Sequence, residues 1–282
     1  MRFLVFLLTL FSISLTYGQE TYRTFKDTRV INTQSTETLK KHQLDVRIGH
    51  RFGDLAGDAG GWPTFYGLEN ASDVMIGVDY GLSDNLSLGL FRTKGSGPLK
   101  QLLTFNAKYK LLQQSSSKPV SIALVGMTTM STMESSETAG AINNFEQFAH
   151  RLVYNGQLII ARKFSDRFAF QVVPSYTHRN IVDEQDVNGI FALGLAGRIQ
   201  ITKVMGFIAD LTLPFSDFRN ADNGYFAPLG FGLEFDTGGH VFQINVTNST
   251  GIMETDYVPY TRSNWGDGQF RLGFTISRLF NL

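Results

Sequence analysis

The sequence contains no cysteine among its 282 residues. Disulfide bonds, zinc sites with thiolate ligands, cysteine nucleophiles and lipid attachment to an N-terminal cysteine are therefore excluded. Net charge is also missing, because 25 basic residues balance 25 acidic ones. A nucleic-acid partner normally requires a basic surface, so this balance argues against nucleic acid.

Long apolar runs are missing after the first twenty residues, where none approaches the ~20 residues of a transmembrane helix. A helical membrane protein is therefore excluded. The chain begins with "MRFLVFLLTLFSISLTYGQE", in which Arg2 precedes an apolar stretch from Phe3 to Leu15. This pattern predicts a secretory signal peptide over residues 1–18 with cleavage after Gly18.

Motifs for catalysis or for cofactors are missing too. "KGSGPLK" (94–100) lacks the spacing of a phosphate-binding loop. The five histidines are His42, His50, His150, His178 and His240, and no two have metal-ligand spacing on one element. We therefore expect no metal, no cofactor and no catalytic residue, and a protein that is not an enzyme. An outer-membrane lipid-modifying or proteolytic enzyme is the least favoured alternative, since no serine follows His150 closely.

Glycine and aromatic residues are abundant, with 28 Gly, 24 Phe and 10 Tyr, which favours an all-β chain. Apolar residues recur at every second position in about twelve segments, each near the ~10 residues of a membrane-crossing strand. These segments are 44–52, 74–80, 86–90, 103–111, 120–124, 152–160, 168–176, 191–199, 207–213, 229–235, 242–246 and 270–276.

Short and long connections alternate between these segments. The short ones are 81–85, 113–119, 163–167, 201–204 and 236–240, and the long ones are 53–72, 93–101, 131–147, 180–188, 214–226 and 248–269. Such alternation is typical of outer-membrane barrels with short periplasmic turns and long external loops. We predict a transmembrane antiparallel β-barrel of about twelve strands over residues 39–282, located in the bacterial outer membrane. A soluble lipocalin-like barrel is the alternative, but it does not explain why every segment keeps an apolar face.

The polar face of the strands would line the lumen, since the apolar face meets lipid. The lumen-lining candidates are Asp45, Arg47, Arg51, Asp79, Lys108, Lys110, Arg151, Arg179, Arg198, Asp210, Glu234, Asp236 and Arg271. They form either ion pairs that fill the barrel or a pore with a mild cationic bias. Barrel size does not decide between a filled lumen and an open pore, because a barrel of ~12 strands lies between filled eight-stranded barrels and open porins with more strands. The polar N-terminal segment 19–38 either remains in the periplasm or plugs the lumen.

Outside the barrel we expect lipid and lipopolysaccharide as partners, with aromatic girdles at both interfaces. His50, His150 and His178 lie on the outward face, either near lipopolysaccharide phosphates or as ordinary interfacial residues. The external-loop ligand candidates are Trp62, Tyr66, Tyr257, Tyr260 and Trp265. These aromatic side chains either stack on a sugar or peptide, or fold over the barrel mouth and bury one another.

Five stretches carry a family resemblance: "TFKDTRVINTQSTETL" (24–39), "LDVRIGHRFG" (44–53), "FYGLENAS" (65–72), "DYGLSDNLSLGLFR" (79–92) and "KYKLLQQ" (108–114). In this order they resemble a family of outer-membrane β-barrel proteins of Gram-negative bacteria that is classed as a domain of unknown function. The resemblance covers most of the chain after residue 18 and implies the barrel and its location. It implies no activity, so no catalytic residue is carried over.

Two functions remain open. The first is passage or binding of a small polar solute, including an anionic one, which an open lumen with unpaired Arg47, Arg51, Lys108 and Lys110 would favour. The second is a non-transporting structural or interaction barrel with a periplasmic or surface protein partner. A lumen blocked by residues 19–38 or by paired charges would favour this second function.

Overall fold

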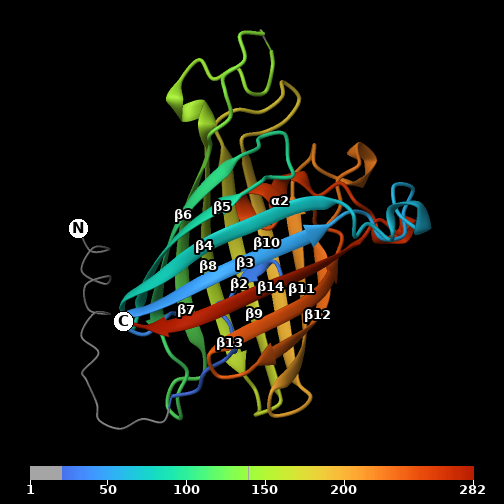
Figure 1. The fold of residues 1–282 in the computed structure, drawn as a ribbon. Helices are drawn as coiled ribbons and strands as arrows, with labels where there is room; N and C mark the ends of the chain where they lie inside the picture. The colour runs from blue at the N-terminus through green and yellow to red at the C-terminus, as the bar shows by residue number, and fades with distance from the viewer. Residues whose placement is uncertain (1–20, 139) are drawn as a thin grey trace, which may run out of the picture.

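The computed structural model describes residues 21–138 and 140–282, so the predicted signal peptide lies outside the described residues. Twelve antiparallel strands close into one barrel (Figure 1). They are β3 (Gln43–Phe52), β4 (Ala71–Ser83), β5 (Leu86–Thr93), β6 (Leu102–Leu112), β7 (Ser121–Ser131), β8 (Leu152–Lys163), β9 (Phe168–Arg179), β10 (Gly189–Gln200), β11 (Met205–Phe215), β12 (Leu229–Asp236), β13 (His240–Thr247) and β14 (Arg271–Asn281). The predicted all-β antiparallel barrel is confirmed.

Each strand pairs with its neighbours in the sequence, and β14 closes the ring against β3. Phe274 lies opposite His50, and Ile276 lies opposite Ile48. A closed ring leaves no strand edge, which a wall in lipid requires because lipid offers no hydrogen-bond partners. The short strands β1 (Arg29–Val30) and β2 (Thr33–Gln34) pair only with each other.

The two faces of the wall differ in chemistry. Along β3, Asp45 and Arg47 are 0% exposed, whereas Ile48 is 43% exposed. Successive side chains of a strand point to opposite sides, so the charged residues face the lumen and the apolar ones face outward. Large apolar side chains on the outward face include Ile76, Leu90, Phe105, Tyr109, Leu124, Tyr154, Phe191, Phe231 and Ile244.

The connections alternate as predicted. We call the end of the barrel with the tight connections the short-turn end, and the opposite end the long-loop end. At the short-turn end Asp84 and Asn85 join β4 to β5. Gly238 has φ 89° in the turn between β12 and β13, a conformation that a residue with a side chain rarely adopts.

Little helix accompanies the strands. The helix α2 (Glu254–Tyr260) lies in the connection between β13 and β14, where the sequence predicted an external loop. Short 3-10 turns are η2 (Trp62–Thr64), η3 (Phe148–Arg151), η4 (Ala221–Asn223) and η5 (Trp265–Asp267). Among the described helices, none has the length and apolar character to cross a membrane.

Two parts of the chain occupy the lumen. The N-terminal segment (residues 21–42) runs within the barrel, where Figure 1 shows β2 among the wall strands. The inserted loop (residues 248–264) enters from the long-loop end, and its helix α2 lies against β8, β9 and β11. The wall begins at Gln43, and the division into residues 19–38 and 39–282 stays a prediction.

Candidate functional site in the barrel lumen

The N-terminal segment is deeply buried although most of its residues are polar. Every residue from 27 to 37 is buried. Its buried apolar side chains between residues 24 and 37 are Phe25, Val30 and Ile31. Buried polar groups must find hydrogen-bond partners, so the wall has to supply them.

Arg47 supplies the strongest of these contacts. Its guanidinium donates to both carboxylate oxygens of Asp27, with Nη1 to Oδ2 at 2.9 Å and Nη2 to Oδ1 at 2.5 Å. A further bond of 2.8 Å runs from Nη2 to Asp45 Oδ2, and Ser277 Oγ donates to the other oxygen of Asp45 at 2.6 Å. The alternation of β3 puts Asp45 and Arg47 on the same face. A bidentate pair of this kind fixes orientation as well as charge.

Other wall residues bind the backbone of the N-terminal segment. Asp210 Oδ2 accepts from the backbone N–H groups of Asn32 at 2.7 Å and of Thr33 at 3.0 Å. Lys108 Nζ donates to the Thr28 carbonyl at 2.8 Å. Gln171 Nε2 donates to the Gln34 carbonyl at 2.7 Å. These side chains replace the partners that a helix or sheet would otherwise provide, so the segment is held with little regular structure.

The inserted loop is fixed by a carboxylate on α2. Asp256 Oδ2 accepts from the backbone N–H and the hydroxyl of Ser96 at 2.7 and 2.9 Å, and Oδ1 accepts from the Gly97 N–H at 2.8 Å. A Cβ on Gly97 would lie 2.5 Å from Tyr260 Cδ2, so only glycine allows this approach. Burial raises the pKa of Asp256, and its hydrogen bonds to Ser96 and Gly97 oppose that rise only in part.

A cluster of charged and aromatic residues closes the long-loop end. Asp186 Oδ2 accepts from Arg179 Nη1 at 2.8 Å and from Arg219 Nε at 2.9 Å. The Arg219 guanidinium lies between the rings of Tyr225 and Tyr260, 4.6 and 4.7 Å from their centroids. Burial raises the pKa of Asp186, but the two arginines outweigh it and hold that pKa below its usual value. The cluster joins two external loops to α2.

The N-terminal segment and the inserted loop meet inside the barrel. Arg29 Nη2 lies 3.0 Å from Glu254 Oε2. Arg51 of β3 donates to Asn32 Oδ1 on one side, and to the carbonyls of Ser249 at 3.0 Å and Gly251 at 2.5 Å on the other. The described chain therefore occupies the lumen from both ends.

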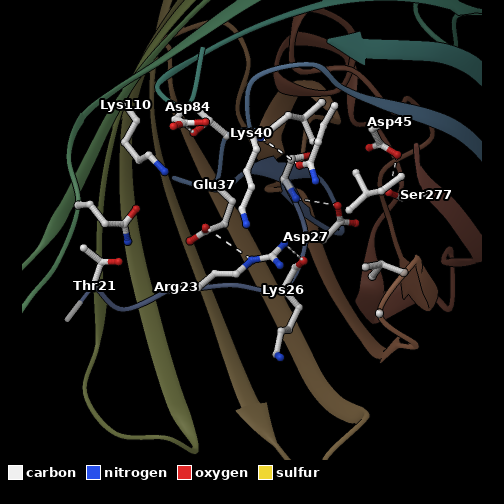
Figure 2. Close-up of a pocket in the computed structure, with 18 residues that line it drawn as sticks. Thr21, Arg23, Lys26, Asp27, Glu37, Lys40, Asp45, Asp84, Lys110 and Ser277 are labelled. Carbon is white, nitrogen blue, oxygen red and sulfur yellow. Dashed lines mark hydrogen bonds and ion pairs between the residues drawn. The ribbon is translucent and has the colours of Figure 1, made fainter. Parts of the chain in front are cut away.

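A cavity of about 600 Å³ lies at the short-turn end, and we call it the short-turn pocket (Figure 2). The N-terminal segment forms one side of it and the wall forms the other. The charged residues that line it are Arg23, Lys26, Asp27, Glu37, Lys40, Asp45, Asp84 and Lys110. This pocket is thus polar and is built by two parts of the chain that no covalent cross-link joins.

The sequence matches a family model described as a membrane-bound β-barrel domain (DUF5777) over residues 25–280. The chain belongs to this family. The resemblance predicted from five stretches of sequence is confirmed. No curated protein sequence matches the chain.

Solved porin-type barrels are similar to this DUF5777 barrel. The NanC porin has a TM-score of 0.50 at 13% identity, covering 85% of this chain and 100% of that chain. The KdgM porin, solved with disordered oligogalacturonate, has a TM-score of 0.48 at 9% identity, covering 84% and 99%. The COG4313 outer membrane channel from Pseudomonas putida F1 has a TM-score of 0.46 at 16% identity, covering 87% and 98%. At such low identity the NanC similarity shows the fold alone.

The predicted lumen-lining residues of this DUF5777 barrel fall into two groups. Those that are buried are Asp45, Arg47, Arg51, Asp79, Lys108, Arg179, Arg198, Asp210, Glu234 and Arg271. Arg198 and Glu234 bind each other, with Nε 2.6 Å from Oε1. Lys110, Arg151 and Asp236 are half-buried. Arg151 lies in η3 at the long-loop end, where it donates to the Met133 carbonyl and stacks on Phe145.

The predicted ligand residues of the external loops lie in different surroundings. Trp62 and Tyr66 are 71% and 48% exposed on the loop after β3. Tyr257 is 1% exposed on α2, so its side chain is buried within the protein. Tyr260 also lies on α2, within the cluster of Arg179 and Arg219. Trp265 stacks on Phe270 with ring centroids 4.6 Å apart.

Residues that could hold a metal do not gather in the described chain. No group of three or more His, Asp or Glu residues with metal-binding geometry occurs in residues 21–138 and 140–282. His50 lies on the outward face, 5.7 Å from Phe274 and 4.3 Å from Phe52 between ring centroids. A contact between His50 and lipopolysaccharide stays a prediction.

Sequence reasoning missed several lumen residues. Gln171 and Gln243 are polar, inward-facing residues of β9 and β13, and the alternation of those strands identifies their face. Asp27, Arg29 and Glu254 lie outside the wall strands, and no periodic pattern marks them. Their partners are distant in the sequence, so only the folded chain reveals them.

Proposed function

We propose that this protein is an outer-membrane channel for small polar solutes, and that the described state is closed by its own chain. The observation that carries the proposal is the polar attachment of the N-terminal segment to the wall. Asp27 with Arg47, and Asp210 with Asn32 and Thr33, are contacts that water can replace. A segment held in this way can leave the lumen without exposing a large apolar surface.

The wall does not need the segment for its own hydrogen bonds. All twelve wall strands pair among themselves, while β1 and β2 pair only with each other. After the segment leaves, Arg47, Lys108 and Asp210 would face water in a polar lumen. Such a lumen suits polar solutes, including anionic ones. The fold similarity to porins supports a channel rather than an enzyme, and supports the outer membrane as its location.

The second candidate is a non-transporting barrel that works through a periplasmic or surface protein partner. One observation favours it: Arg47 and Arg51, which an open pore would leave unpaired, are both hydrogen-bonded in the described state. A permanently closed lumen would serve such a function. The two candidates differ in whether the N-terminal segment ever leaves.

A disulfide lock tests the channel directly. A Cβ on Gly194 of β10 would lie 3.5 Å from Thr33 Cγ2 of the N-terminal segment, which favours a disulfide in the double variant Thr33→Cys with Gly194→Cys. The parent chain has no cysteine, so no other disulfide competes. In planar bilayers we expect openings from the reduced double variant and none from the oxidised one.

Each single-cysteine variant is the control, because oxidant should leave its openings unchanged. We also expect a variant lacking residues 21–38 to open more often than the parent. If neither the parent nor this deletion variant conducts, the channel proposal is wrong and the non-transporting barrel remains.

A further inference from the structure

The short-turn pocket has carboxylates that are already engaged by the protein. Asp27 and Asp45 both accept from Arg47. Glu37 Oε1 accepts from the Thr24 N–H at 2.9 Å and from the Phe25 N–H at 3.3 Å. Asp84 Oδ1 accepts from the Lys41 N–H at 2.9 Å. The acidic groups of the pocket are thus largely satisfied.

The basic groups of the same pocket are only partly engaged, because Lys26 pairs with Asp236 at 3.3 Å whereas two other lysines of the described chain have no such partner. The ammonium groups of Lys40 and Lys110 have no hydrogen-bond or ion-pair partner within residues 21–138 and 140–282. Arg23 Nη2 donates to the Lys26 carbonyl, and Arg23 Nε forms only a long ion pair of 3.7 Å with Glu37 Oε2. Figure 2 shows the side chains of Arg23, Lys40 and Lys110 directed into the same space. The pocket therefore offers free donors and little free acceptor.

We propose that the short-turn pocket binds a small polyanion, a molecule with two or more carboxylate or phosphate groups, between Arg23, Lys40 and Lys110. Its volume of about 600 Å³ lies within the usual range of small-molecule sites. Hydrogen bonds from cationic donors to carboxylate or phosphate oxygens are among the stronger ones in proteins.

The position of the pocket gives the ligand a regulatory effect, which rests on the proposed channel function. Arg23 and Lys40 belong to the N-terminal segment, whereas Lys110 belongs to β6 of the wall. The pocket exists only while the segment is seated. A ligand that binds only this state must favour it, so a polyanion at the short-turn end holds the channel closed. At ten times its Kd, the ratio of closed to open barrels should rise about eleven-fold.

Calorimetric titration of the full chain in detergent micelles with citrate tests the site. We expect citrate to bind the parent, inorganic phosphate to bind more weakly, and glucose to give no heat of binding. The double variant Lys40→Gln with Lys110→Gln should weaken citrate binding ten-fold or more. The matched control is Lys118→Gln with Lys203→Gln, which removes the same charge from two other turns of the short-turn end and should bind as the parent does.

The proposed polyanion site would be wrong if the two double variants bound citrate with equal affinity, or if citrate did not bind the parent. Conductance measurements distinguish a failure of the proposed binding site from a failure of the proposed channel function. If citrate binds as expected and no variant conducts, the site stands and the channel proposal fails. If the barrel conducts and citrate does not reduce its openings, the regulatory effect is wrong.

Discussion

Arg51 connects three parts of the molecule: the wall, the N-terminal segment and the inserted loop. It belongs to the wall, and its guanidinium reaches both the N-terminal segment and the inserted loop. Arg47, four residues earlier on the same face, binds the N-terminal segment and the wall residue Asp45, but not the inserted loop. An arginine suits the junction because its donors are arranged in a rigid fork that serves several acceptors at once. Neither occupant of the lumen is therefore independent of the other.

Replacing Arg51 with Met should loosen both occupants at once. The change removes the Arg51 donor from Asn32 Oδ1 and from the Ser249 carbonyl, at a cost of about 1–3 kcal/mol for each buried acceptor, while the Gly251 carbonyl keeps its bond from the Ser249 hydroxyl. In this variant, the rate of backbone hydrogen exchange, measured by mass spectrometry, should increase both in residues 29–34 and in residues 249–258. Arg167→Met, at an exposed position in a short turn, should leave both regions as in the parent. Faster exchange in only one of the two regions would argue against the junction.

The inserted loop shows how an element can be placed by its surroundings rather than by its own sequence. α2 has seven residues, contains Pro259 and has no side-chain cap, so it is too weak to form alone. Its position depends on Asp256 against Ser96 and Gly97, and on the Asp186 cluster that joins the neighbouring loops. The packing of three separate loops therefore determines where this helix lies.

Protonation of Asp186 should release this arrangement. The pKa of Asp186 is lowered in the folded chain, so its contribution is fully present above its usual value of 3.8 and is lost as pH falls through the folded pKa. At pH 7, Asp186→Asn should lower the exchange protection of α2 by about 2 kcal/mol, or roughly thirty-fold. The difference between parent and variant should shrink as pH falls below 3.8 and should vanish once pH lies below the lowered pKa of Asp186 in the folded chain.

The control for this pH effect is Asp222→Asn, at an exposed position of η4 in an adjoining loop. The exchange protection of α2 in this control variant should equal that of the parent at every pH. A difference between the Asp186 variant and the parent that persists at acid pH would mean that the side-chain shape, and not the charge, holds the loops.

At the scale of the whole molecule, the wall follows from the sequence, whereas a lumen plugged by residues 19–38 was only one of two alternatives that the sequence left open. Alternation identified all twelve strands, and it placed Arg47 and Asp210 on the inward face. The same method fails for residues 27–37, because a polar segment in a polar lumen has no apolar face to reveal. For Tyr257 it left two alternatives open, a ligand contact or burial at the barrel mouth, because an aromatic residue in a long connection fits both equally well. Pairs such as Asn32 with Asp210 join distant parts of the chain and leave no local pattern.

The wall should persist without its contents. A variant that lacks residues 21–38 keeps every strand of the closed ring, so its strand content by circular dichroism should match the parent after refolding. Its resistance to unfolding by sodium dodecyl sulfate in the cold should also remain. Loss of the barrel in this variant would show that the segment is a required part of the folded wall.

The polar attachment of the N-terminal segment also has a thermal consequence. Exposure of apolar surface raises the heat capacity of a protein, whereas exposure of polar surface lowers it. Because release of this segment exposes mostly polar groups, its heat-capacity change should be small. A van't Hoff plot of segment release would then be nearly straight, while unfolding of an ordinary apolar core gives a curved one. The balance between seated and released segment should therefore vary smoothly across the temperatures at which a bacterium lives.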